Sequence, residues 1–459
     1  MNFKKILSVF LTAVLCMGCV SCGDESSDSK KEKTTKKENN KSELFINDKS
    51  EDDTTEVLEI ELPEKESDVP EVDFDALEAQ ATESGACGDN VNWYLIGDEL
   101  VIAGIGDMYD YDSSSPPSWF AFSDSLAKVS IQEGVTSIGD FAFYNCQKLT
   151  MVTISDSVTS IGEKAFCDCD TLTTIVIPDS VTSIENGAFC SCSSLISFVF
   201  PDGVTNIGED TISYCENLTE IIIPDGVTSI GEAAFLYCTS LTEITIPDSV
   251  KSIGDRAFLG CDSLTSITIP DSVTSIGKAL FKSCDNLTSI TIPDSVTIIE
   301  SYTFYECIAL TTITIPDNVT SIEGGAFLGC VSLSSIIIPD NVKTIGDEAF
   351  FGCTSLNSII IPDSVTSIGE NAFSQCTSLT VITIPDGVKS IGNRVFWECI
   401  SLSSIVIPDS VTILGRGAFD ECYSLTDVYY TGTEEEWNKM LGDEYFGSLS
   451  MATIHFNSK

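Results

Sequence analysis

The sequence has very little histidine and few basic residues. One His occurs in 459 residues, and 23 Lys and Arg stand against 70 Asp and Glu, which gives a formal net charge of -47. The scarcity of His removes most His-based acid–base, triad and zinc chemistry. A charge this negative repels nucleic acid and anionic membrane surfaces, so neither is an expected partner. No motif indicates a metal site or a cofactor.

Long hydrophobic runs are also missing. Apart from the apolar run Ile6–Leu15, no stretch approaches the roughly 20 apolar residues that a membrane-spanning helix needs. This run follows two lysines and precedes small residues and cysteines, which predicts an export signal over residues 1–22. It resembles a bacterial lipoprotein signal, which implies lipidation of Cys22, with Cys19 as the alternative, and a lipid-anchored location at the cell surface. With a plain secretory signal the protein would instead be secreted.

Residues 23–86 have almost no apolar periodicity. They are rich in Ser, Lys, Glu and Asp, first basic and then acidic. Such a segment buries too little apolar surface to offset the entropy of ordering it. We therefore expect a disordered, charged tether over residues 23–86.

The rest of the chain repeats with a period of 23 residues. Its cysteines keep this spacing without slippage and stand at Cys146, Cys169, Cys192, Cys215, Cys238, Cys261, Cys284, Cys307, Cys330, Cys353, Cys376, Cys399 and Cys422. Leu, Pro and Phe follow the same period, and the Phe series is interrupted only by Ile212. A fixed period of this length predicts a solenoid, here of 13 full coils within residues 126–430.

One repeat unit shows how a coil is expected to form. Ile267 and Ile269 alternate with polar residues, as in a half-buried strand. Pro270 and Asp271 then favour a turn, because Pro presets its own φ and Asp bonds nearby backbone N–H groups. The chain is expected to return to the next coil through a short helical turn or an irregular loop.

The repeat, Leu-x-x-Ile-x-Ile-Pro-x-x-Val-x-x-Ile-Gly followed by Ala-Phe-x-x-Cys-x-x-Leu, resembles that of BspA-like (Treponema-type) leucine-rich repeat surface proteins. The resemblance implies a β-rich leucine-rich repeat solenoid with a small β cap at residues 87–125 and a C-terminal cap at residues 431–459. It also implies adhesion to, or recognition of, extracellular or host proteins, without catalysis. A docking scaffold within the cell's own envelope is the alternative, and an acidic hydrolase is a more distant one.

The cysteine series has a structural and a chemical interpretation. Each Cys stands three residues after Phe and three before Leu, where a small inward-facing apolar residue fits. Free Cys is among the most buried residue types, so structural thiols are expected. Cys167 and Cys190 form a second, adjacent pair, and they are the best disulfide candidates if the protein has any disulfide.

An Asp follows the turn position of every coil from Asp156 to Asp409. Carboxylates stacked about 5 Å apart attract a hard cation such as Ca²⁺. A turn-forming role explains the position without an ion. We therefore expect weak, diffuse calcium binding rather than a defined site.

Two groups of outward-facing residues are candidates for a binding face. The hydroxyl residues of the strand, interrupted in other coils by Val and Ile, are Ser266, Thr268, Ser289, Thr291, Thr312 and Thr314. The aromatic residues next to the repeated Cys include Tyr237, Phe351 and Trp397. Aromatic residues are favoured at interfaces, and solvent-facing drift between copies is the alternative explanation.

Overall fold

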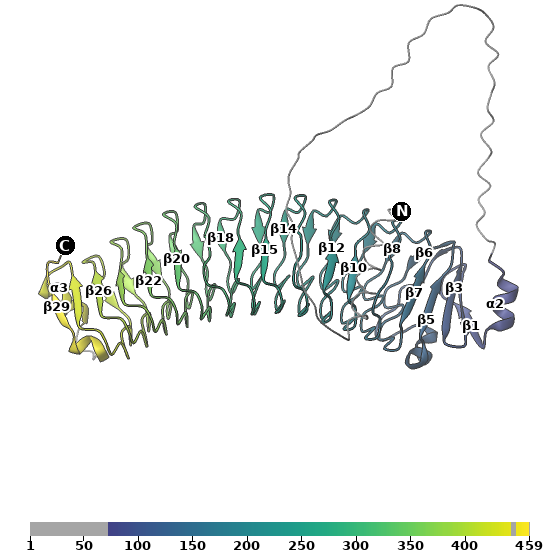
Figure 1. The fold of residues 1–459 in the computed structure, drawn as a ribbon, viewed down its shortest axis with the longest axis horizontal. Helices are drawn as coiled ribbons and strands as arrows, with labels where there is room; N and C mark the ends of the chain where they lie inside the picture. Colours follow the sequence, from purple (N-terminus) through teal and green to yellow (C-terminus); the bar gives the residue numbers. More distant parts are fainter. Residues whose placement is uncertain (1–71, 442–446, 459) are drawn as a thin grey trace, which may run out of the picture. The chain divides into compact units, whose positions relative to one another are not determined.

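The computed structural model describes residues 72–441 and 447–458, which fold into a stack of similar coils (Figure 1). Strands at the same place in successive coils pair in parallel with an offset of 23 residues, as in Ser266↔Ser289 and Ser229↔Ser252. The fold is a parallel β-solenoid of about 14 turns. The predicted fold class is therefore confirmed.

The first strand of each coil forms a row that we call the strand face. Its members are β5 (Lys128–Ile131), β7 (Met151–Ile154), β10 (Ser197–Val199), β12 (Glu220–Ile222), β15 (Ser266–Thr268), β17 (Ser289–Thr291), β20 (Ser335–Ile337), β22 (Ser358–Ile360), β24 (Val381–Thr383), β26 (Ser404–Ile407) and β28 (Asp427–Tyr430). Three further coils have no strand here but still bury the equivalent Ile175, Ile244 and Ile313. Burial of alternate residues thus continues where strand geometry lapses.

The second strand of each coil is shorter. This row comprises β6 (Val135–Ile138), β8 (Ser160–Ile161), β9 (Ser183–Ile184), β11 (Asn206–Ile207), β13 (Ser229–Ile230), β14 (Ser252–Ile253), β16 (Ser275–Ile276), β18 (Ile298–Ile299), β19 (Ser321–Ile322), β21 (Thr344–Ile345), β23 (Ser367–Ile368), β25 (Ser390–Ile391) and β27 (Ile413–Leu414). The turn between the rows is closed by a bond from the Val273 amide to the Pro270 carbonyl (3.0 Å). Ser272 Oγ donates to the Val250 carbonyl of the preceding coil (2.6 Å).

The third side of each coil, which we call the turn side, is more regular than predicted. Two residues per coil have left-handed φ values, for example Ala279 (52°) and Ser283 (57°). The amides of Ala279, Phe281 and Ser283 donate to carbonyls of the next coil at 2.7–2.9 Å. Because these bonds recur, the expected helical turn or irregular loop is in fact an ordered ladder of tight turns.

The N-terminal cap is larger than predicted. It consists of α2 (Phe74–Gln80), β1 (Glu83–Ala86), β2 (Val91–Ile96), β3 (Glu99–Gly104), β4 (Gly106–Asp107) and the 3-10 helix η1 (Ser118–Ser125). β1, β2 and β3 are antiparallel, and β3 pairs in parallel with β5, so the cap continues the strand face. The tether predicted over residues 23–86 is therefore wrong for its last part, since Phe74–Gln80 and Glu83–Ala86 are folded.

Local chemistry explains this correction. The Asp73 carboxylate caps α2 by accepting from the Ala76 amide (2.9 Å). Leu77 and Ala81 then pack against Tyr94 and Val101 of the cap sheet. The helix cap, these apolar contacts and the pairing of β1 with β2 order a segment whose composition is otherwise that of a solvated chain. The remainder of the predicted tether and the predicted signal lie outside the described residues.

The C-terminal cap closes the other end of the core. It consists of α3 (Glu434–Leu441), the 3-10 helix η2 (Gly447–Met451) and β29 (Thr453–His455), which pairs in parallel with β28. Trp437 of α3 is buried, and its ring centroid lies 5.1 Å from that of Tyr430. Thr433 and Glu436 form a capping box at the start of α3. No helix among the described residues is both long and apolar enough to span a bilayer.

Candidate functional site

The strand face brings the six predicted hydroxyl residues together. All six are exposed on one side of consecutive coils, and they are Ser266, Thr268, Ser289, Thr291, Thr312 and Thr314. Between them lie the buried Ile267, Ile290 and Ile313. The alternation of inward and outward residues read from the sequence therefore holds across these coils.

The strand face is uncharged over a long stretch. From Ser266 to Val406 none of the outward-facing strand residues carries a charge, although the protein has a formal charge of -47. Two neighbouring residues on this stretch, Ile337 and Ile360, are 81% and 80% exposed, and Val381 in the next strand is 48% exposed. We call Ile337, Ile360 and Val381 the aliphatic patch. In the sequence these residues look only like interruptions of the hydroxyl pattern.

The three predicted aromatic residues lie elsewhere, on the turn side. Tyr237 is exposed, and its ring lies 5.3 Å from that of Tyr214 in the preceding coil. The Tyr237 ring also covers Gly260, where an added Cβ would lie only 2.4 Å from it. Phe351 and Trp397 are half-buried. The predicted candidate face is thus two separate surfaces, because the strand and the turns occupy different sides of each coil.

The repeated cysteines are buried, hydrogen-bonded thiols. Twelve of them donate to the carbonyl of the residue 26 positions earlier, as Cys284 Sγ does to Phe258 O (3.1 Å). Burial raises the pKa of Cys238 to about 12. The thiolate is the reactive form, so these residues are chemically inert. The structural interpretation of the series is confirmed.

Cys167 and Cys190, which the sequence left open, form a disulfide. They lie on the turn side of adjacent coils, with a Cα–Cα distance of 4.6 Å and a sequence separation of 23 residues. A bond between two turns of the stack fits their equivalent places in the repeat. It ties the second and third coils together.

The Asp residues after Pro line one edge of the strand face. Asp271 is exposed, and the turn beside it is held by Ser272 and the backbone. At this turn the side-chain hydrogen bond to the preceding coil comes from Ser272. Among the described residues, no group of three or more His, Cys, Asp or Glu side chains is placed to hold a metal ion.

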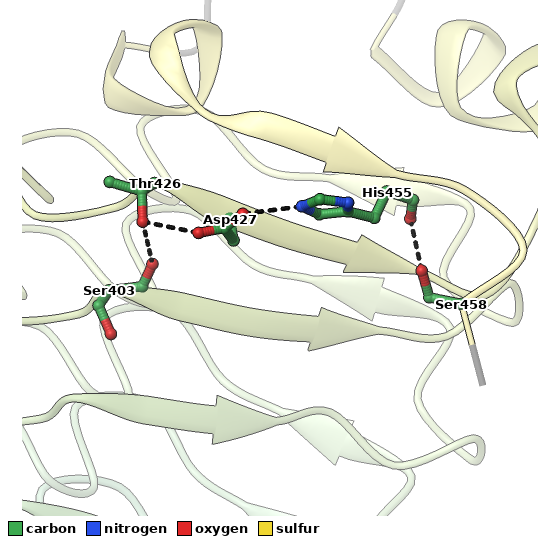
Figure 2. A network of polar contacts seen from close by, with 5 residues as sticks. All are labelled: Ser403, Thr426, Asp427, His455 and Ser458. Atoms are coloured by element: carbon green, nitrogen blue, oxygen red, sulfur yellow. Dashed lines mark hydrogen bonds and ion pairs between the residues drawn. The ribbon is translucent and has the colours of Figure 1, made fainter.

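The only histidine belongs to a clamp in the C-terminal cap (Figure 2). His455 Nε2 lies 2.7 Å from Asp427 Oδ1, and the His455 ring stacks on Tyr429 at 4.7 Å. The hydrogen bond with His455, followed by that from Thr426, lowers the pKa of Asp427. Ser458 donates to the His455 carbonyl rather than to its ring, so this is not the geometry of a nucleophile and its base. The clamp joins β29 to β28.

Coils of 23 residues with inward Leu and Ile, parallel strand rows and a continuous apolar core define a leucine-rich repeat solenoid. The model of the BspA type leucine-rich repeat region matches residues 114–242, 228–357 and 343–459. The matches cover most of the chain, and the protein belongs to this family. Its fold is a leucine-rich repeat scaffold, and the family match indicates no enzyme family.

Solved structures include several similar proteins. A leucine-rich repeat protein from Bacteroides ovatus is 29% identical, with 80% of this chain and 98% of that chain covered and a TM-score of 0.68. A leucine-rich cell surface protein from Faecalibacterium prausnitzii is 28% identical, with 80% and 100% covered and a TM-score of 0.46. A leucine-rich repeat protein from Eubacterium ventriosum is 27% identical, with 64% and 94% covered and a TM-score of 0.45. No curated protein sequence matches the chain significantly.

Proposed function

We propose that the protein is an exported, non-catalytic adhesin whose strand face binds extracellular proteins. The observation that carries this proposal is the uncharged stretch of strand face with the aliphatic patch at its centre. Solvent-exposed aliphatic side chains on adjacent strands are uncommon on an acidic, soluble surface and mark interaction sites. Membership of the BspA-type family supports the same function.

The aliphatic patch has the form of an interface centre. Ile360 pairs in register with Ile337, and Val381 pairs with Ser358 of the same strand as Ile360. The patch is surrounded by Ser and Thr, which supply a polar rim. Binding energy usually concentrates in a few central apolar residues that the rim shields from water.

A binding assay tests this proposal. The purified full chain is titrated onto immobilised extracellular-matrix proteins, proteins from neighbouring cells and proteins from its own envelope. Replacing Ile337 and Ile360 by Asp is expected to weaken binding at least about tenfold, because two charges would be desolvated in the interface. Ile413→Asp is the matched control, since Ile413 is 62% exposed but lies in the second strand row.

The results distinguish the proposal from its alternatives. Saturable binding to extracellular proteins that the patch variant loses and the control keeps supports the adhesin. Binding only to the cell's own envelope proteins favours a docking scaffold. Turnover in broad peptidase and glycosidase assays, abolished by one carboxylate substitution, would identify a hydrolase instead.

Export and lipid anchoring form the second part of the proposal. They are supported by the apolar run Ile6–Leu15 and the cysteines that follow it. Mass spectrometry of the mature N-terminus is expected to find a lipidated Cys22. A lipidated Cys19 would move the cleavage site, and an unmodified N-terminus would mean that the protein is secreted.

A further inference from the structure

A small recess opens where the N-terminal cap meets the first coil, far from the aliphatic patch in the order of the coils. It is lined by Asp112, Ser113, Pro116, Phe120, Phe141 and Tyr144, and it has a volume of about 50 Å³. One water needs about 10–15 Å³ by this measure, so the recess has room for a group of a few heavy atoms. A sugar ring with its hydroxyls or a folded peptide is too large for it.

Most of the wall is aromatic or aliphatic. The rings of Phe141 and Tyr144 are in edge-to-face contact, with their centroids 5.6 Å apart, and Phe120 and Pro116 complete the wall. An aromatic face carries partial negative charge and attracts organic cations. A protein cation already lies near this ring, since Lys164 Nζ is 5.4 Å from the Phe141 centroid and 3.6 Å from Glu163 Oε1.

The rim of the recess is negative. Asp112 Oδ1 accepts from the amides of Ser114 (2.7 Å) and Ser115 (2.8 Å) and from the Ser114 hydroxyl (2.6 Å). The hydrogen bonds from the Ser114 side chain and backbone lower the pKa of Asp112, so this carboxylate is ionised at neutral pH. An apolar pocket with a fixed negative rim complements a cation whose own surface is apolar.

We propose that this recess binds a methylated ammonium group. A primary ammonium group has three N–H donors that water satisfies, and an aromatic wall offers no acceptors to replace that water. A quaternary ammonium group has no donors to lose, and its methyl groups pack against rings while its charge is attracted by them and by Asp112. A neutral apolar group would gain the packing without the attraction. The chemistry of the walls therefore selects a trimethylammonium head.

The test uses the full chain and four small probes. Tetramethylammonium and choline are titrated while transfer of magnetisation from the protein to their N-methyl protons is followed by NMR. Both are expected to bind saturably. The neutral isostere 3,3-dimethylbutan-1-ol is expected to bind about tenfold more weakly, because it lacks the cation–π and carboxylate attraction. Butylamine, which presents a primary ammonium group, is expected to bind more weakly than choline.

Three variants locate the site. Asp112→Asn and Phe120→Leu are each expected to weaken choline binding several-fold. Tyr144→Phe keeps the aromatic ring and is expected to leave choline binding unchanged. Tyr237→Leu is the control, because it removes an exposed ring from the turn side outside the recess. Thermal unfolding shows whether each variant is folded, and the exposed Asp112 gives a test that does not disturb the core.

The proposal is overturned by any of three results. These are no saturable signal from choline, equal binding of choline and its neutral isostere, or unchanged binding in both Asp112→Asn and Phe120→Leu. None of these results bears on the strand face, so the recess and the adhesin are tested independently.

Discussion

The fourth coil, which contains Phe198, Phe200 and Ile212, fills its part of the core differently from the coils after it. In a regular coil, two Ile lie in the strand and one Phe on the turn side, where Phe281, for example, stacks between the rings of its neighbours at 5.6 and 5.8 Å. In the fourth coil, Ile212 occupies the turn-side position, Phe198 lies in β10, and Phe200 directly follows β10. All are buried, and Phe198 lies 4.9 Å from Phe189. The core stays filled although Phe and Ile have exchanged positions, so we expect the filling of the coil to matter more than the identity of each residue.

The coils just before the fourth also differ from the later coils, because a disulfide links them. The disulfide Cys167–Cys190 joins the second and third coils, and the third coil has no strand on the strand face. At the equivalent turn-side positions of later coils stand residues such as Leu236 and Leu259. A covalent bond therefore joins two coils where strand pairing is missing from the strand face, although β9 still pairs with β8 in the second row.

The largest effect is expected from removing a ring in the regular part. Phe281→Ala should reduce the free energy of unfolding by about 3–5 kcal/mol, because it leaves a cavity between two stacked rings. Urea unfolding followed by circular dichroism measures it, and the exposed Tyr423→Ala serves as the control. A loss below about 1 kcal/mol for Phe281→Ala would show that the coil collapses around the gap and that the Phe series is dispensable.

Removing the disulfide should have the next largest effect. Cys167→Ser with Cys190→Ser is expected to lower stability by about 3 kcal/mol, the chain-entropy value for a loop of this length. Reduction of the wild type should give the same shift in the urea midpoint. Leu236→Cys with Leu259→Cys places the same pair in the regular part, and its oxidation should stabilise that part. No change on reduction would mean that backbone pairing and packing hold the third coil unaided.

Placing Phe, the residue of the regular coils, at position 212 of the fourth coil should by itself lower the stability of the protein. Ile212→Phe is expected to destabilise the protein by about 1–3 kcal/mol, because Phe198 and Phe200 already fill this coil and the new ring would overpack it. Adding Phe198→Ile and Phe200→Ile should recover most of the loss. Urea unfolding measures this through a double-mutant cycle in which Phe198→Ile and Phe200→Ile together count as one change and Ile212→Phe as the other. Additive effects would contradict the idea that the coil is specified by its total volume.

The sequence was sufficient to predict which residues face the core of the solenoid, but not to predict all of the structure on its surface. Period and alternation predicted the burial of Ile267, Ile269 and Cys284, because every coil repeats the same requirement. They did not predict the two left-handed turn residues per coil, since Ala279 and Ser283 occupy positions where Gly is the usual signal. The folding of α2 was hidden by its charged composition.

The candidate sites were predictable to different degrees. The exposure of the strand-face hydroxyl residues followed from period-2 alternation, whereas the position of Tyr237 on a different side of the coil did not, because sequence spacing does not reveal which side of a coil a turn occupies. The recess was not predictable at all. It joins Asp112 of a cap loop to Tyr144 of the first coil, and the two belong to different patterns in the sequence.

The smallest effect concerns the end of the stack, where the polar clamp between His455 and Asp427 adds to the pairing of β29 with β28. In the folded protein the pKa of Asp427 is lowered, chiefly by its hydrogen bond with His455. The unfolded chain has an Asp pKa of about 3.9. The clamp therefore contributes stability above that pH, and the contribution is lost as the pH falls through the lowered, folded value. Asp427→Asn should remove it.

Hydrogen exchange of the β29 amides gives the local readout, because a clamp at the end of the chain protects its own strand rather than the whole solenoid. At pH 6, β29 in Asp427→Asn should exchange faster than in the wild type, and Asp386→Asn, an exposed turn carboxylate, should not. At a pH below the lowered pKa of Asp427, the wild type and Asp427→Asn should be alike. Equal protection at both pH values would show that the backbone pairing of β29 with β28 is sufficient, and that the ends of the solenoid are held in the same way as its middle.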